Sequence, residues 1–104
     1  MAKIEFTELA ISDINEIATY IGFDSVNYAS LQVAKIFAKS ETLENNPLIG
    51  RVVPELKMKS VREVFEGNYR IIYRIVNKEI IHILTIHHSR RRLNRQDIKR
   101  IIKK

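Results

Sequence analysis

At 104 residues, the chain has room for a single domain, residues 1–104, and no apolar run in it approaches the ~20 residues that cross a bilayer. The absence of cysteine excludes disulfides and thiolate metal sites, and the amino terminus lacks a secretory signal, so we expect a cytoplasmic protein without a membrane partner. The net charge of +6 divides into −4 for residues 1–50 (three basic against seven acidic) and +10 for residues 51–104 (fifteen against five).

The first residues predict a short strand followed by an amphipathic helix. Ile4 and Phe6 alternate with polar neighbours, as in a strand with one buried face. A helix is expected to begin near Thr7 or Glu8 and to end at Gly22. Its apolar residues recur at spacings of three and four and form the stripe Ala10, Ile14, Ile17, Ala18 and Ile21. The residues expected to face water are Asp13, Asn15, Glu16 and Thr19.

A second amphipathic helix follows directly. Asp24 or Ser25 can cap its start. Its buried stripe consists of Ala29, Val33, Ile36, Phe37 and Leu43. Residues 45–50 are dense in turn formers and end the helical half, and residues 51–60 predict an irregular connection. The two helices therefore form a hairpin whose stripes need the apolar face of a sheet to cover.

Three strands are predicted in the second half, over residues 61–66, 68–75 and 80–92, and the last ends in a basic cluster. The only breaks are Gly67-Asn68 and Asn77-Lys78, and such pairs can take the positive φ of a tight hairpin. The strands are therefore expected to be antiparallel neighbours. The helical hairpin should cover one face of their sheet, which leaves the other face free to bind a partner.

Basic side chains dominate the polar positions of this predicted sheet. Arg62, Arg70 and Arg74 are expected to point outward, with Arg90, Arg91 and Arg92 at the end of the last strand. This excess of positive charge favours contact with RNA, DNA or an acidic protein. A solubilising face is the alternative that charge alone leaves open.

A short basic helix is expected at the carboxyl end. Asn94 can cap it, with Asp97 at the favourable third position. Ile98, Ile101 and Ile102 then lie on one side of the helix. A helix this short can dock on the sheet, fray, or be displaced by a partner.

The ordered set of motifs resembles the RelE/ParE superfamily of bacterial type II toxins over nearly the whole chain. The order is strand, helical hairpin and three-stranded meander, with Tyr69-Arg70-Ile71-Ile72-Tyr73 in the middle strand and His87-His88-Ser89-Arg90-Arg91 closing the last. The ParE-like branch and proteins called plasmid stabilisation proteins share similar segments, here Asn46-Pro47, Gly50-Arg51, Val53-Pro54 and Val61-Arg62-Glu63.

The resemblance implies an α+β fold in which the helical hairpin packs on a four-stranded, mainly antiparallel sheet, with a short carboxy-terminal helix. It also implies a toxin that an antitoxin neutralises by wrapping an extended or helical segment over it. ParE-like members poison DNA gyrase, whereas RelE-like members cut mRNA on the ribosome.

The residues at the positions that are catalytic in RelE-like enzymes help to distinguish the two branches. RelE-like enzymes use two arginines, which correspond here to Arg70 and Arg90. Their two lysines are replaced by Val61 and Glu63, and a tyrosine is replaced by Gln96. These departures remove much of the acid–base equipment that metal-free RNA cleavage needs, and they favour the ParE-like branch.

The histidines near the end of the last strand keep a nuclease hypothesis open. Other nuclease branches end this strand with a catalytic histidine, so His87 or His88 can supply proton transfer near neutral pH. Neighbouring strand residues point to opposite faces, which makes the pair a poor metal site. His82 lies roughly 20 Å away along the strand, so no metal and no cofactor are expected. A structural role for all three histidines is the alternative.

The leading hypothesis is a ParE-like toxin that inhibits growth by binding DNA gyrase. Its expected contacts with target or antitoxin are Arg62, Arg70, Arg74, Arg90, Arg91 and Arg92. The alternative is a ribosome-dependent mRNA endonuclease with Arg70, Arg90, His87 and His88 as catalytic residues. The third hypothesis is an inactive toxin-like protein that only binds an antitoxin.

Overall fold

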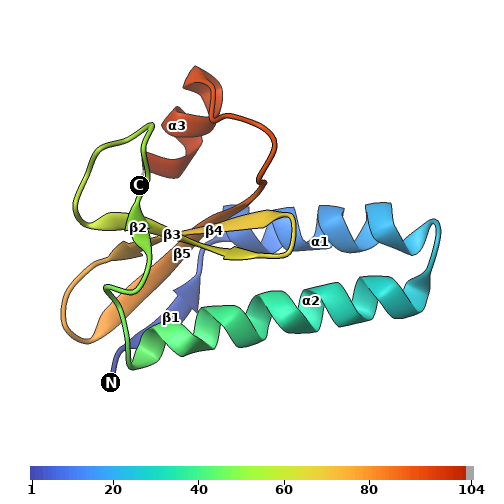
Figure 1. The fold of residues 1–104 in the computed structure, drawn as a ribbon, viewed down its shortest axis with the longest axis horizontal. Helices are drawn as coiled ribbons and strands as arrows, with labels where there is room; N and C mark the ends of the chain where they lie inside the picture. The colour runs from blue at the N-terminus through green and yellow to red at the C-terminus, as the bar shows by residue number, and fades with distance from the viewer. Residues whose placement is uncertain (103–104) are drawn as a thin grey trace.

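The computed structural model describes residues 1–102 and confirms the α+β class (Figure 1). Its elements in chain order are β1 (Lys3–Phe6), α1 (Glu8–Gly22), α2 (Val26–Glu41), the 3₁₀ turn η1 (Thr42–Glu44), β2 (Arg51–Val52), β3 (Val61–Glu66), β4 (Tyr69–Ile75), β5 (Ile80–His88) and α3 (Arg95–Ile102). One sheet runs in the order β1-β5-β4-β3-β2, and all pairs are antiparallel except β1 with β5. Within residues 1–102, no helix combines the length and apolar character that crossing a membrane requires.

The sheet has five strands, so the expected number of four is wrong by one. The additional strand, β2, contains only Arg51 and Val52, which pair with Glu63 and Arg62 of β3. The sequence predicted an irregular connection here because two residues are too few to display an alternating pattern.

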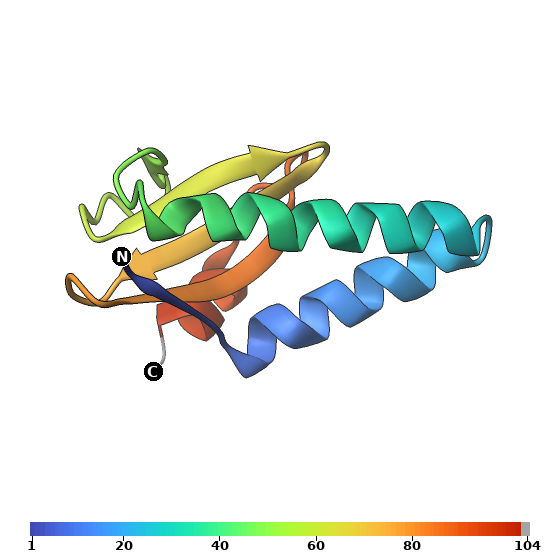
Figure 2. The ribbon, with the colours of Figure 1, turned by 90° about the horizontal axis from the view of Figure 1, so that it is seen from below.

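The helical hairpin covers one face of the sheet, as expected (Figure 2). The interior between them is one apolar cluster whose fully buried members include Ala10, Ile36, Leu43, Ile71, Tyr73, Ile81 and Ile83. Thr7 begins α1 by accepting the backbone N–H of Ala10 at 3.1 Å. Ser25, rather than Asp24, begins α2 by accepting the N–H of Tyr28 at 3.1 Å.

The opposite face of the sheet is also covered, and the expectation of a free face is therefore wrong. The connection over residues 53–60 and helix α3 pack on it, so that the molecule has three layers (Figure 1). A second apolar cluster lies between them and consists of Val53, Val61, Ile72, Leu84, Leu93 and Ile101. The stripe predicted on α3 supplies part of this cover.

The meander follows the predicted breaks with two differences. Gly67 has φ +58°, as the tight β3–β4 hairpin requires. The β4–β5 loop takes four residues, 76–79, and the Asn77 carboxamide accepts the N–H groups of Glu79 (2.7 Å) and Ile80 (3.0 Å). Strand β5 ends at His88, so the arginines predicted at its end lie in a linker, residues 89–94.

Helix α1 also closes the edge of β5 where β1 stops. β1 pairs as far as Ile83, and beyond this point Asp13 of α1 accepts the N–H of Ile86 at 3.0 Å and the hydroxyl of Thr85. Burial raises the pKa of Asp13, although these bonds to its carboxylate work in the opposite direction. Asp13 therefore does not face water as expected, because its carboxylate takes the place of a missing strand.

Candidate functional site

The predicted basic residues of the sheet do not share one face. Arg62 is paired with Tyr73 and lies on the hairpin side, whereas Arg70 lies two positions from Ile72 on the α3 side. The Arg62 side chain donates to the carbonyls of Lys59 (3.1 Å) and Gly50 (3.0 Å), so it holds the chain on either side of β2.

Arg70 is buried at the centre of an ionic network on the α3 side. Its Nε donates to Glu63 at 2.6 Å, and its two terminal nitrogens donate to Glu55 at 3.0 and 2.9 Å. The other oxygen of Glu63, whose side chain is fully buried, accepts Nε of Arg51 at 2.6 Å. The sheet register explains the arrangement, because Arg70 faces Phe65 and is diagonal to Glu63 on the same face.

Glu55 connects this network to the linker before α3. Besides Arg70, its carboxylate accepts the backbone N–H of Leu93 at 3.2 Å. These bonds, first that to Arg70, lower the pKa of Glu55 to about 2. Burial acts to lower the pKa of Arg70, but the two carboxylates outweigh it and the pKa is raised.

The expectation that Arg70 points outward is therefore wrong. Only 5% of the residue is exposed, and all three of its guanidinium nitrogens donate to carboxylates. A buried charge needs such partners to be tolerated. In this conformation Arg70 joins the sheet to the 53–60 connection.

The histidines at the end of β5 occupy different environments. His87 lies opposite Arg70 in the sheet register and is 8% exposed, and its buried Nε2 has no hydrogen-bond partner among the described residues. Burial lowers the pKa of His87. His88 lies opposite Tyr69, with its ring edge-on to the tyrosine at 5.5 Å between centroids, and its Nδ1 accepts the N–H of Arg90.

A polar cleft of about 390 Å³ lies over His87, between α1, the end of β5 and α3. Asp13, Asp97 and Arg91 are among its lining residues. Within the described part of the chain, no three His, Cys, Asp or Glu side chains are arranged to hold a metal ion. The third histidine, His82, lies apart from this cleft and contacts Glu5 at 3.1 Å.

Arg74 lies in another cleft on the α3 side. It is half-buried and faces His82 across β4 and β5. Arg100 of α3 lines the same cleft, together with apolar residues of β5 and α3. Arg74 is thus less accessible than the outward position predicted for it.

Six exposed cations lie close together in sequence, in the linker and on α3. The basic surface, as we call it below, consists of Arg90, Arg91, Arg92, Arg95, Lys99 and Arg100. All six are exposed, and none takes part in an ion pair with residues 1–102. The sequence predicted the first three, and it contained the signal for the others, which are the polar residues of an amphipathic helix.

A capping box fixes the start of the helix that presents these cations. Asn94 Oδ1 accepts the N–H of Asp97 at 2.8 Å, and Asp97 Oδ2 accepts the N–H of Asn94 at 3.0 Å, as predicted. Ile98 and Ile101 then face the sheet, so the basic side chains of α3 point to solvent. The capped and docked helix therefore holds the cations of this surface in a defined arrangement.

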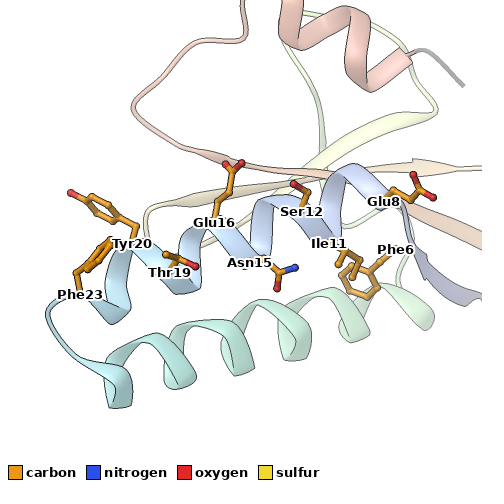
Figure 3. Close-up of a pocket in the computed structure, with 9 residues that line it drawn as sticks. All are labelled: Phe6, Glu8, Ile11, Ser12, Asn15, Glu16, Thr19, Tyr20 and Phe23. Atoms are coloured by element: carbon orange, nitrogen blue, oxygen red, sulfur yellow. The ribbon is translucent and has the colours of Figure 1, made fainter.

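A different surface, without clustered charge, lies along the outer side of α1. A groove of about 660 Å³ runs there, and Figure 3 shows Tyr20 and Phe23 at the end nearest the turn to α2. Sequence reasoning missed both aromatic residues. The available signal was that they are large, apolar and outside the buried stripe.

A comparison with protein-family models identifies one family. The model of the ParE toxin of type II toxin–antitoxin systems, parDE, matches residues 4–93. A solved structure described as the chromosomal ParDE TA system from P. aeruginosa matches with a TM-score of 0.68 and 22% sequence identity, covering 85% of this chain and 96% of that chain. At this identity the structural likeness concerns the fold alone. No curated protein matches the chain in sequence.

Proposed function

The chain belongs to the ParE toxin family of type II toxin–antitoxin systems, and from this premise we propose that it arrests growth by binding DNA gyrase. Its membership confirms the resemblance to the ParE-like branch that the sequence motifs indicated. As a toxin of such a system, it has an antitoxin protein as partner. Gyrase is the target that the ParE-like resemblance implies.

The observation that carries the proposal is the contrast between Arg70 and the basic surface. Arg70 is one of two arginines that a RelE-like nuclease would use on phosphate, yet its three guanidinium nitrogens bind Glu55 and Glu63. The six cations of the basic surface are exposed instead. This arrangement supports binding to an anionic macromolecular surface, such as a gyrase–DNA complex, without covalent chemistry by the toxin.

The first test is pulse labelling of DNA and protein synthesis in the minutes after induction of the chain in a susceptible host. Early loss of thymidine incorporation, with amino-acid incorporation continuing, is expected for a gyrase poison. Early loss of amino-acid incorporation would instead indicate mRNA cleavage, and the absence of any growth arrest would indicate the inactive toxin-like protein.

A second test locates the binding surface in a supercoiling assay with purified gyrase. Replacing Arg90, Arg91 and Arg92 by glutamine removes three exposed charges and is expected to weaken inhibition at least about tenfold. The matched control replaces three exposed lysines elsewhere in the chain, Lys35, Lys59 and Lys78, by glutamine. Equal loss in both triple variants would show that only net charge matters, and unchanged inhibition by the arginine variant would refute the assigned surface.

One observation favours the nuclease as the second candidate. His87 lies opposite Arg70, and its Nε2 has no hydrogen-bond partner among the described residues. A group that transfers a proton to or from a substrate would be unpartnered in this way before the substrate binds. For this role Arg70 would have to leave Glu55 and Glu63. In a ribosome-dependent cleavage assay, His87→Gln should then abolish cleavage, whereas a gyrase poison should give no cleavage with either protein.

A further inference from the structure

A small pocket on the α3 side of the sheet is lined mainly by arginines. It measures about 330 Å³, at the lower end of the range for small-ligand sites, and its lining residues are Arg51, Pro54, Glu55, Arg70 and Arg92. These residues belong to four segments that are separate in the sequence: β2, the 53–60 connection, β4 and the linker before α3. The fold therefore brings three guanidinium groups to one pocket.

The positive charge of this pocket is only partly neutralised within the chain. Glu55 binds Arg70, and the buried carboxylate of Glu63 is shared between Arg70 and Arg51. Three arginines thus meet two carboxylates. Arg92 takes part in no ion pair with residues 1–102. One further anionic group would balance the excess charge.

Arg51 is held in place with its terminal nitrogens open. Its Nε donates to Glu63 at 2.6 Å, and its guanidinium carbon lies 5.3 Å from the ring centroid of Phe65. The side chain is nevertheless 61% exposed, and Nε is the only nitrogen of Arg51 that binds a carboxylate of residues 1–102. A guanidinium in a fixed orientation can bind a phosphate through two parallel hydrogen bonds, which the single ammonium of lysine cannot do. Arg51 is therefore preorganised for such an anion.

Phe65 adds an aromatic surface to this site. It is 42% exposed and forms a cation–π contact with Arg51. Nucleobases stack on aromatic rings and on guanidinium planes, and proteins that bind single strands combine this stacking with phosphate contacts. The carboxylate of an acidic protein offers no flat base to extend the stack. The combination of open arginines and an exposed ring therefore favours a nucleic acid with unpaired bases over an acidic protein.

We propose that this pocket binds single-stranded DNA, with one phosphodiester on Arg51 and Arg92 and a neighbouring base stacked against Arg51 and Phe65. The choice of DNA over RNA rests on the proposed function, because DNA is the substrate of gyrase. A phosphodiester carries one negative charge, which matches the excess charge of the pocket. Arg70 stays bound to its two carboxylates, so the contact does not use the arginine on which a RelE-like nuclease would rely.

The test is fluorescence anisotropy of a labelled single strand of about 16 nucleotides with the purified full-length chain, in the absence of gyrase. Each phosphate contact contributes about 0.7 to the slope of log affinity against log salt for single strands. Arg92→Gln should therefore weaken binding and lower this slope by about 0.7. Phe65→Leu should weaken binding at least about fivefold with the slope unchanged, because it removes stacking and no charge.

Two further variants separate position from charge. Lys78→Gln removes an exposed charge from the β4–β5 loop and should change the affinity less than about twofold. Arg51→Lys keeps the charge but loses the fork of two terminal nitrogens, and it should weaken binding at least about fivefold. Because Arg51→Lys also alters a partner of Glu63, its denaturation curve is compared with that of the wild type. Arg92→Gln and Phe65→Leu leave the hydrogen bonds of the ionic network intact and decide the test if Arg51→Lys unfolds.

Three outcomes would overturn the proposal. Unchanged affinity of Phe65→Leu would show that no base stacks there. Equal losses in Arg92→Gln and Lys78→Gln would show that only net charge matters. Stronger competition by RNA of the same sequence, or by polyglutamate, than by unlabelled DNA would assign the pocket to RNA or to an acidic protein.

The binding assay also separates this inference from the proposed target. A chain that inhibits supercoiling but does not bind single-stranded DNA would refute the inference and leave the proposed function standing. A chain that binds DNA through Arg92 and Phe65 but does not inhibit supercoiling would refute gyrase as the target and leave the ligand of the pocket established.

Discussion

The two faces of the sheet are stabilised by different kinds of interaction. On the hairpin side, the interior is an apolar cluster that joins α1 and α2 to the three central strands. On the α3 side, a smaller apolar cluster lies beside the buried ionic network of Arg70, Glu63 and Glu55. The first face is stabilised by hydrophobic burial, whose free energy does not depend on the direction of individual contacts. The second depends on oppositely charged groups at defined distances.

This difference indicates how the fold combines stability with an exposed basic surface. Glu55 binds both Arg70 and the backbone before α3, so the ionic network helps to position the linker that bears Arg90, Arg91 and Arg92. The apolar face needs no such precision, because hairpin and sheet are joined by many side chains. Changes on the two faces should therefore have different consequences.

The largest effect is expected from removing the buried carboxylate of Glu63. Glu63→Ala leaves the Arg70 guanidinium, whose side chain is 6% exposed, with one carboxylate instead of two. Breaking a buried ion pair from one side costs about 3–5 kcal/mol. Urea denaturation should show a loss of this size in the free energy of unfolding. Glu66→Ala, at a partly exposed position of the same strand, is the control and should cost less than about 1 kcal/mol.

A paired truncation compares the two apolar clusters directly. Ile36 of α2 is fully buried on the hairpin side, and Ile36→Ala should cost about 3 kcal/mol. Ile101 is 5% exposed on the α3 side, but α3 has only eight residues and can detach locally. Ile101→Ala should therefore cost about 1–2 kcal/mol in denaturation, with faster amide exchange confined to α3. Equal costs would contradict the distinction between the faces.

The pH dependence tests the ionic network alone. The pKa of Glu55 falls from its ordinary value of 4.5 to about 2 in the folded protein, so its stabilising contribution is fully present above pH 4.5 and is lost as pH falls towards 2. One proton corresponds to a slope of at most about 1.4 kcal/mol per pH unit. Glu55→Gln should be less stable at pH 7, and its difference from the wild type should shrink between pH 4.5 and 2. A difference independent of pH would refute the assignment.

Local patterns predicted most of the fold, because periodicity and turn chemistry are properties of neighbouring residues. The stripes of α1 and α2, the cap at Asn94 and the Gly67 turn were all visible in this way. The strand β2 was not, because two residues carry no period. The position of α3 was not either, since an amphipathic stripe shows that a helix is covered but not by which face of a sheet.

The candidate site was harder to predict than the fold because charge partners are set by three-dimensional register. Arg70 resembled an exposed strand arginine, yet its partner Glu55 lies 15 residues away in an irregular connection. Asp13 was predicted to face water on its helix, yet its carboxylate binds the edge of β5, 73 residues away. By contrast, the consecutive arginines of the linker are exposed as expected. Burying three adjacent charges in a small domain would cost free energy unless each had its own partner.

Substitutions of the two helix caps should distinguish the two ends of the helical hairpin. Thr7 caps α1 and also donates its hydroxyl to the carbonyl of Leu84 at 2.9 Å, whereas Ser25 caps α2 at the turn between the two helices through one bond. Thr7→Ala should cost about 2 kcal/mol, since it removes the cap and leaves a partly buried carbonyl without its donor. Ser25→Ala should cost about 0.5–1 kcal/mol.

Thr7→Ser keeps both hydrogen bonds and is the control for the first substitution. If Ser25→Ala proved the costlier cap variant, the turn between α1 and α2 would contribute more to stability than the sheet end of the hairpin. The expected order instead makes the sheet end of the hairpin the part that holds the fold together. The turn between α1 and α2 then contributes little to folding, because the two helices extend past the end of the sheet there and no strand packs against them (Figures 1 and 2).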